Sequence, residues 1–177
     1  MKENLQGKVC LITGATNGIG EEAAKQIALM GAEIVFIARS PGKAEELKQS
    51  LKSLTGREST SIIADLSSQE EVKRAASEFL SMNKPLNILL NNAGIINTSR
   101  KETVDGLEEV FSVNHLAYYS FTLMLINKLI ESGPSRVVNV ASGAHMFVKD
   151  MNFDDLQSEK EYKTMQVYGR SKLANIL

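Results

Sequence analysis

The sequence predicts an α/β fold, a doubly wound parallel sheet with helices on both faces. Two observations support this prediction. Short apolar segments alternate with longer segments of helical periodicity along the 177 residues, which is the pattern of βαβ units. No repeat, low-complexity tract or linker interrupts the alternation, so we expect residues 1–177 to form a single domain. Right-handed crossovers between the strands then make the sheet parallel.

The first strand is predicted over Val9–Thr13, which is short, apolar and partly β-branched. A glycine-rich stretch follows it, and apolar residues at helical spacing then predict a helix over Glu21–Met30. The second strand is predicted over Ile34–Ala38. Ser40 and Pro41 begin the next helix, because serine is a favoured N-cap and proline is favoured at the first helical position.

The third strand is predicted over Ser61–Ala64. Ser67 and Ser68 are each followed three residues later by a glutamate, and these overlapping capping boxes predict a helix that runs to Phe79. The fourth strand is predicted over Asn87–Leu90, a short apolar segment.

A largely helical period covers Val104–Ile130, and the fifth strand is predicted over Arg136–Ala141. The polar and acidic stretch Met151–Lys163 is interpreted as an excursion over the surface. A final helix is predicted to begin near Glu161 and to be still running at Leu177.

The composition excludes several classes of partner. Hydrophobic residues make up 43% of the chain and the formal net charge is −1, so there is no basic field for nucleic acid or an anionic membrane. No apolar run reaches the roughly 18 residues of a transmembrane span, and Met1–Gly7 lacks the apolar segment of a signal peptide. Cys10 is the single cysteine and lies in an apolar run, so we expect it to pack in the core. Because no internal disulfide can form, we expect a soluble, intracellular, cytoplasmic protein.

The stretch T-G-A-T-N-G-I-G, residues 13–20, is either a nucleotide-binding loop or a glycine-rich turn, and alone it does not decide. Its position does favour a phosphate site, because it joins a strand to a helix whose first N–H groups have no helical partners. Gly14 would allow the tight turn, Gly18 the close approach of a phosphate, and Gly20 the close packing of helix on strand.

This spacing resembles the short-chain dehydrogenase/reductase family, and further motifs follow in family order. They are Asn91-Asn92-Ala93-Gly94 after the fourth strand, Asn114 in F-S-V-N-H-L, Ser142 at the end of V-V-N-V-A-S, and Tyr168 and Lys172 in Y-x-x-x-K. The last helix, Y-G-R-S-K-L-A-N-I-L, looks most like the retinol-dehydrogenase-like branch. The resemblance implies a Rossmann-type sheet of strand order 3-2-1-4-5. It also implies that the chain is C-terminally incomplete, since relatives continue beyond this helix.

The resemblance implies an oxidoreductase that transfers hydride between a nicotinamide cofactor and a hydrophobic carbonyl or alcohol, such as a retinoid- or lipid-like aldehyde or ketone. The implied cofactor-binding residues are Gly14, Thr16, Asn17, Gly18, Ile19, Gly20, Arg39, Ser40, Asp65, Leu66, Asn92, Ala93, Gly94, Tyr168 and Lys172. Asp65 would accept a hydrogen bond from the adenine amino group, and Asn92 to Gly94 would lie beside the nicotinamide ribose.

The end of the second strand bears on the choice of cofactor. NAD-binding folds place a carboxylate there for the ribose 2′-hydroxyl, whereas this chain has Ala38 followed by Arg39. A cation without the acid suits the 2′-phosphate of NADP, so we expect NADP(H) in preference to NAD(H). The alternative is a solvated arginine at a strand end, and Asn17 offers no second cation before the middle glycine.

The resemblance makes Asn114, Ser142, Tyr168 and Lys172 the catalytic residues. Tyr168 would donate the proton to the carbonyl oxygen. A free phenol has a pKa near 10, and Lys172, one helical turn later, could lower it by its charge. Ser142 would bind the substrate oxygen, and Asn114 would hold a water that links the lysine to solvent. Considered alone, Tyr168 is better explained by helix packing.

Two other functions stay open. One is a nucleotide-binding regulatory or scaffold protein of the same fold without turnover. The other is an α/β hydrolase that uses Ser142 with His115 or His145, although no G-x-S-x-G elbow is present. The two histidines and the single cysteine have no metal-ligand spacing, so no metal is expected. Assembly as a homo-oligomer is left open.

Overall fold

The computed structural model describes residues 4–177 and contains one five-stranded parallel sheet. The strands are β1 (Val9–Thr13), β2 (Glu33–Ala38), β3 (Thr60–Ile63), β4 (Ile88–Asn91) and β5 (Arg136–Asn139). Their spatial order is β3-β2-β1-β4-β5, which confirms the predicted fold class and strand order. The order reverses next to β1, because the chain crosses from β3 at one edge to β4 on the other side of β1.

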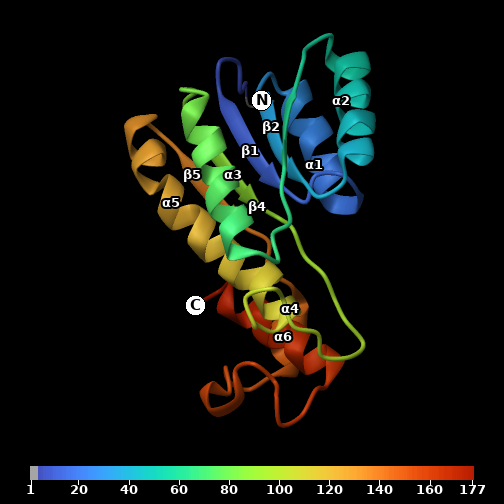
Figure 1. Cartoon of the computed structure of the whole chain (residues 1–177). Helices are drawn as coiled ribbons and strands as arrows, with labels where there is room; N and C mark the ends of the chain where they lie inside the picture. Colours follow the sequence, from blue (N-terminus) through green and yellow to red (C-terminus); the bar gives the residue numbers. More distant parts are fainter. Residues whose placement is uncertain (1–3) are drawn as a thin grey trace.

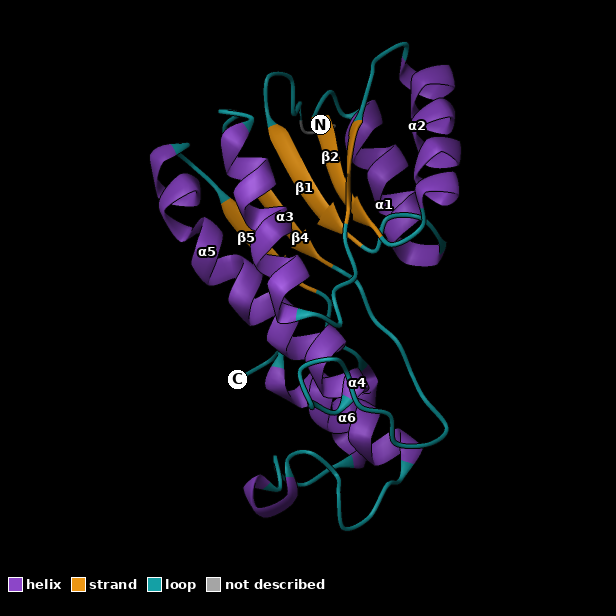
Figure 2. Cartoon of the chain, in the orientation of Figure 1, coloured by secondary structure: helices purple, strands orange, loops and turns teal. Residues whose placement is uncertain are grey.

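Helices cover both faces of this sheet (Figure 1, Figure 2). The helical elements are α1 (Gly18–Leu29), α2 (Pro41–Thr55), α3 (Gln69–Ser81), α4 (Glu109–Phe111), the π-helical turn η1 (Ser112–Leu116), α5 (Ala117–Glu131), the short 3₁₀ turns η2 (Gly143–Phe147) and η3 (Phe153–Asp155), and α6 (Thr164–Ala174). Helices α1 and α2 pack together on one face, and α3 and α5 on the other. Helix α6 lies beyond the carboxyl ends of the strands, beside α4.

The core is split into two layers by the alternation of side chains along the strands. In β1, Val9 and Leu11 pack with α3 and α5, whereas Cys10 and Ile12 pack with α1 and α2. Both faces of the sheet are covered by apolar side chains, so the central strands read as continuous apolar runs. Cys10 is fully buried as expected, and burial raises the pKa of its thiol to about 12.

The predicted caps are only partly correct. Ser40 caps α2, with its hydroxyl accepting from Lys43 N at 3.4 Å and with Pro41 in the first turn. Ser68 alone caps α3 by accepting from Glu71 N. The Glu71 carboxylate does not return to this cap, because it accepts from Asp65 N at 2.9 Å. The reciprocal capping box is therefore replaced by a bond to the preceding loop.

Several predicted boundaries are wrong. The helical segment begins at Glu109 rather than Val104, because the Glu108 carboxylate accepts from the N–H groups of the first turn, at 2.9 and 2.7 Å. Strand β5 ends at Asn139 rather than Ala141, since its partner β4 ends at the residue opposite. Helix α6 begins at Thr164 and ends at Ala174, and the final residues form a tighter turn on Leu173.

Candidate functional site

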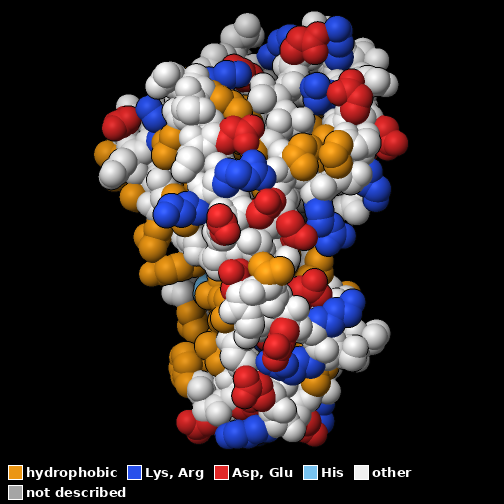
Figure 3. All heavy atoms as spheres, viewed as in Figure 1, with side chains coloured by type: hydrophobic (Ala, Val, Ile, Leu, Met, Phe, Trp, Pro, Cys, Tyr) orange, Lys and Arg blue, Asp and Glu red, His pale blue; other side chains and the backbone are white. Residues whose placement is uncertain are grey.

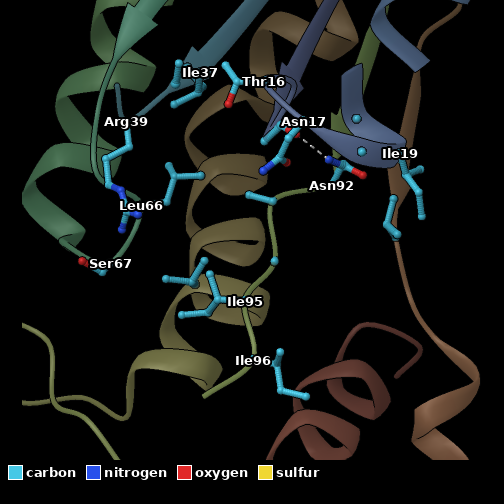
Figure 4. Close-up of a pocket in the computed structure, with 18 of the residues that line it drawn as sticks. Thr16, Asn17, Ile19, Ile37, Arg39, Leu66, Ser67, Asn92, Ile95 and Ile96 are labelled. Carbon is cyan, nitrogen blue, oxygen red and sulfur yellow. Dashed lines mark hydrogen bonds between the residues drawn. The ribbon is translucent and has the colours of Figure 1, made fainter. Parts of the chain in front are cut away.

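A cleft of about 630 Å³ opens at the carboxyl ends of the strands, where the strand order reverses between β1 and β4. Open α/β sheets bind ligands at this kind of position. Figure 4 shows Arg39, Leu66 and Ser67 on one side of the cleft, Asn17 and Asn92 near the start of α1, and Ile95 and Ile96 toward the other end. The lining includes every predicted cofactor residue except Ser40, which lies at the N-cap of α2.

The glycine-rich loop exposes the start of α1 to this cleft. Gly14 and Gly18 adopt left-handed conformations, with φ of +66° and +53°. A side chain on Gly14 would meet Ala93 Cα at 2.6 Å, whereas nothing lies within 4 Å of one on Gly18. The Asn17 side chain does not cap the helix, so the first N–H groups of α1 point toward open space. This geometry is suited to an anion.

A polar frame holds the loop against β4. Thr13 Oγ1 accepts from the backbone N–H groups of Asn92 and Ala93, at 2.9 and 3.1 Å. The Asn92 side chain donates in turn to the carbonyls of Thr13 and Gly14, at 3.1 and 3.0 Å. No sequence motif indicated a role for Thr13 itself. The Thr13 hydroxyl therefore links the carboxyl end of β1 to the carboxyl end of β4.

The cleft end formed by β2 and β3 contains Arg39, Asp65 and Leu66. Arg39 is exposed and reaches into the cleft lining from the end of β2. The Asp65 carboxylate accepts from Ser67 N at 2.9 Å, which orders the turn before α3. Leu66 is only 8% exposed and forms an apolar part of the cleft wall. The position at the end of β2 that carries a carboxylate in NAD-binding folds is occupied here by Ala38, which is buried.

The opposite end contains Tyr168 and Lys172 from α6. Lys172 Nζ donates to the Val140 carbonyl at 2.9 Å and lies 5.8 Å from the centre of the Tyr168 ring. The lysine is only 3% exposed, and within residues 4–177 no carboxylate forms an ion pair with it. Burial therefore lowers the pKa of Lys172 to about 8. The hydrogen bond to the Val140 carbonyl holds the Lys172 ammonium in position. The group loses its proton at a lower pH than an exposed lysine does.

The buried ammonium predicts a pH effect on stability. Between pH 8 and 10.5 the unfolded chain retains the Lys172 proton that the folded chain has released, so stability should rise with pH in this window. We expect the wild-type protein to gain free energy of unfolding relative to Lys172→Met across that range and to run parallel to it below pH 8. Urea unfolding at several pH values measures the difference. Parallel curves throughout would contradict the prediction.

Asn114 lies in the π-helical turn η1 and is fully buried. Its carbonyl oxygen Oδ1 accepts from Ile95 N at 2.8 Å, and its Nδ2 donates to Ile95 O and Ser171 Oγ, both at 3.0 Å. A side chain on Gly94 would lie 3.6 Å from both Asn114 Oδ1 and Lys172 Nζ. Asn114 thus links the segment after β4 to α6.

Tyr118 is a further residue that the sequence analysis missed. Its hydroxyl donates to the Ala93 carbonyl at 2.6 Å, and Lys172 Nζ lies 5.6 Å from its ring centre. Burial raises the pKa of Tyr118, so it remains a neutral donor. Its signal in the sequence, a tyrosine on the apolar face of a helix, is shared with ordinary core residues.

Ser142 lines the cleft, and its Oγ accepts from Ala144 N at 3.2 Å. His145 Nδ1 lies 2.7 Å from the Ser142 carbonyl oxygen, not from the hydroxyl. Among the described residues no histidine nitrogen is bonded to Ser142 Oγ, so the serine lacks the base that a hydrolytic nucleophile requires. The geometry argues against the hydrolase alternative.

The placement of these motifs agrees with the comparison to protein families, in which the model for the short chain dehydrogenases matches residues 8–153. The chain belongs to the short-chain dehydrogenase family. It is 40% identical to retinol dehydrogenase 12 of Mus musculus and 41% identical to retinol dehydrogenase 11 of Homo sapiens, each over 174 residues. These matches confirm the predicted family and its retinol-dehydrogenase-like branch.

Each match covers 98% of this chain but only 55% and 54% of these two dehydrogenases, so the chain spans about half of their length. Among solved structures, the RhlG/NADP active-site complex of Pseudomonas aeruginosa superposes with a TM-score of 0.77 at 29% identity. That match covers 97% of this chain and 64% of the other.

The surface and the remaining elements place further bounds on the molecule. Acidic and basic side chains are interspersed over the face shown in Figure 3. Across residues 4–177, none of the helices combines the length and the apolar character needed to cross a bilayer. The same residues contain no group of three or more potential metal ligands.

Proposed function

We propose that this short-chain dehydrogenase is an NADP(H)-dependent oxidoreductase that interconverts a hydrophobic carbonyl compound and its alcohol. The observation that carries the proposal is the convergence of two features in one cleft. The exposed N-terminus of α1 lines one part of this cleft, and Tyr168 and Lys172 line another part of the same cleft. We also propose that residues 1–177 act as one nucleotide-binding domain.

The residues of the cleft fit a nicotinamide dinucleotide. The open space at Gly18 and the unpaired N–H groups of α1 suit the pyrophosphate. Gly94 lies against Lys172 Nζ with no side chain of its own, which leaves room for a ribose beside the ammonium. Arg39 provides the charge-assisted contact that a 2′-phosphate needs, and the end of β2 carries Ala38 in place of a carboxylate.

The cofactor supplies or accepts the hydride, and the side chains of this chain manage the accompanying proton. In the direction of reduction, Tyr168 Oη donates a proton to the carbonyl oxygen as negative charge develops there. The Lys172 ammonium stabilises the resulting phenolate, since the two groups lie on one face of α6. Ser142 donates a hydrogen bond to the same substrate oxygen and orients it.

The substrate is proposed to be retinoid- or lipid-like. Ile95, Ile96 and Val113 line the cleft and offer apolar contacts to a substrate. Two relatives with about 40% identity are named retinol dehydrogenases, which supports the same class. Incubation of the full-length protein with NADPH and a panel of retinoid, aliphatic and steroid carbonyls tests this. Turnover restricted to small hydrophilic aldehydes would refute the class.

Arg39→Ala should weaken the preference for NADPH over NADH. The wild type is expected to bind NADPH more tightly than NADH, and the variant to lose about tenfold in NADPH affinity with little change for NADH, since one charged hydrogen-bond partner is removed. Isothermal titration with each cofactor measures this. The matched control is Arg57→Ala, because Arg57 is also an arginine but bonds carbonyls at the end of α1, far from the cleft lining. Equal wild-type affinities, or an unchanged preference in Arg39→Ala, would refute the NADP assignment.

A further inference from the structure

Asn175, the C-cap residue of α6, forms two side-chain hydrogen bonds to the π-helical turn. Its Nδ2 donates to the Asn114 carbonyl at 2.8 Å, and its Oδ1 lies 3.0 Å from His115 Nδ1. Asn114 and His115 precede Asn175 by 61 and 60 positions in the sequence. None of the roles described above involves Asn175.

The contact to Asn114 determines which atom is the donor in the contact to His115. A carbonyl oxygen only accepts, so the amide must turn its NH₂ group toward Asn114. Its oxygen then faces His115, and an oxygen requires a donor, so Nδ1 of His115 must bear the hydrogen. The neutral imidazole therefore has its hydrogen on Nδ1 and not on Nε2. The contact fixes a tautomer that can be measured.

The position of Asn175 on α6 connects it to the proposed chemistry. Tyr168, Ser171, Lys172 and Asn175 occur at spacings of three and four, so they share one face of the helix. Ser171 and Asn175 both bond Asn114, one at its side chain and the other at its backbone. Two contacts separated by one helical turn resist rotation of α6 about its axis as well as sliding along it.

Helix α6 is also restrained at other points: it packs closely on η2, where a side chain on Gly169 would meet the Ala144 carbonyl oxygen at 2.6 Å, and Lys172 Nζ donates to the Val140 carbonyl. The helix has 11 residues, and its N-cap residue, Lys163, makes no side-chain capping bond. Its first turn follows the surface excursion that includes η3. The bonds from Ser171 and Asn175 add a tie between the polar face of α6 and a buried residue of the scaffold, because Asn114 is itself bonded to Ile95 after β4.

We propose that Asn175 is a positioning residue for the reaction, acting through Asn114. Together with Ser171 it sets the rotation of α6 on the π-helical turn and so aims Tyr168 and Lys172 into the cleft. This inference rests on the proposed oxidoreductase function. It assigns Asn175 no contact with substrate or cofactor, and Asn175 is absent from the cleft lining.

The first test does not depend on activity. Nitrogen chemical shifts of His115 in the full-length protein should show the Nδ1–H tautomer at a pH where the ring is neutral. In Asn175→Leu the ring should return to the Nε2–H tautomer, and the amide hydrogens of η1 should exchange faster with solvent. An Nε2–H tautomer in the wild type, or unchanged amide exchange in the variant, would overturn the inference even if the enzyme turns over.

The second test separates the contact to Asn114 from general damage to the helix end. Asn175→Asp keeps an oxygen for His115 but replaces the donor to Asn114 with an acceptor. We expect kcat to fall by about 10²-fold, as misplacement of a reacting group by roughly 1 Å can cause, with a much smaller change in NADPH dissociation constant. Ile176→Ala alters an exposed neighbour and should keep wild-type kcat.

The outcomes are distinguishable. If wild-type protein shows no turnover with any carbonyl panel, the proposed function fails, and the tautomer and exchange measurements still decide whether the contact exists. If the wild type turns over and folded Asn175→Asp keeps its kcat, or if Ile176→Ala loses as much, the positioning role is refuted.

Discussion

Tyr168→Phe is expected to lower kcat by about 10²–10⁴-fold, the contribution of a general acid to catalysis. The substitution removes the hydroxyl that would donate the proton and leaves the ring, so packing on α6 and the contact with Lys172 Nζ at 5.8 Å should persist. Cofactor affinity should change little, because the phosphate loop lies on β1 and α1. Single-turnover oxidation of NADPH, with a separate titration of NADPH binding, measures both quantities.

The matched control is Tyr119→Phe, which removes the same hydroxyl from an exposed position on α5 outside the cleft. That variant should keep wild-type kcat. A Tyr168→Phe protein that keeps most of its turnover would show that another group donates the proton. A wild-type protein that binds NADPH but shows no turnover would instead favour the regulatory or scaffold alternative.

Gly20→Ala is expected to lower the free energy of unfolding by about 3 kcal/mol, the upper range for forcing extra atoms into a packed region. A methyl group there would collide with the Gly14 carbonyl oxygen and Asn92 Nδ2. Both groups belong to the rigid frame that includes Thr13, so neither can move without breaking a hydrogen bond. NADPH affinity should fall as well, since the same displacement shifts the start of α1. Urea unfolding and NADPH titration provide the measurements.

Gly42→Ala is the control for replacing a helical glycine. Its methyl group would meet only Ser40 Oγ at 3.9 Å, and alanine should stabilise the first turn of α2 by up to about 1 kcal/mol. The two substitutions are chemically identical and should have opposite signs. A Gly20→Ala variant as stable as the wild type would show that the loop can relax and that the close packing at Gly20 is not required.

Much of the fold follows from local pattern alone. The β1 segment is apolar throughout because both of its faces are covered, and this property is visible without any partner residue. Ser40 and Pro41 define the start of α2 through one local bond and one fixed dihedral angle. The order of the glycine loop, Asn114, Ser142 and Y-x-x-x-K was sufficient to predict the family, because these motifs are short and lie in a fixed order.

The tertiary structure decided what depends on docking between distant segments. The Glu71 carboxylate bonds Asp65 instead of its own cap, and β5 stops where β4 stops. Asn114 meets Ser171 and Asn175 across 57 and 61 residues, respectively. Lys172 has a lowered pKa because neighbouring elements exclude water from it. No periodicity or motif encodes these outcomes, since each depends on how separate segments pack against one another in the folded chain.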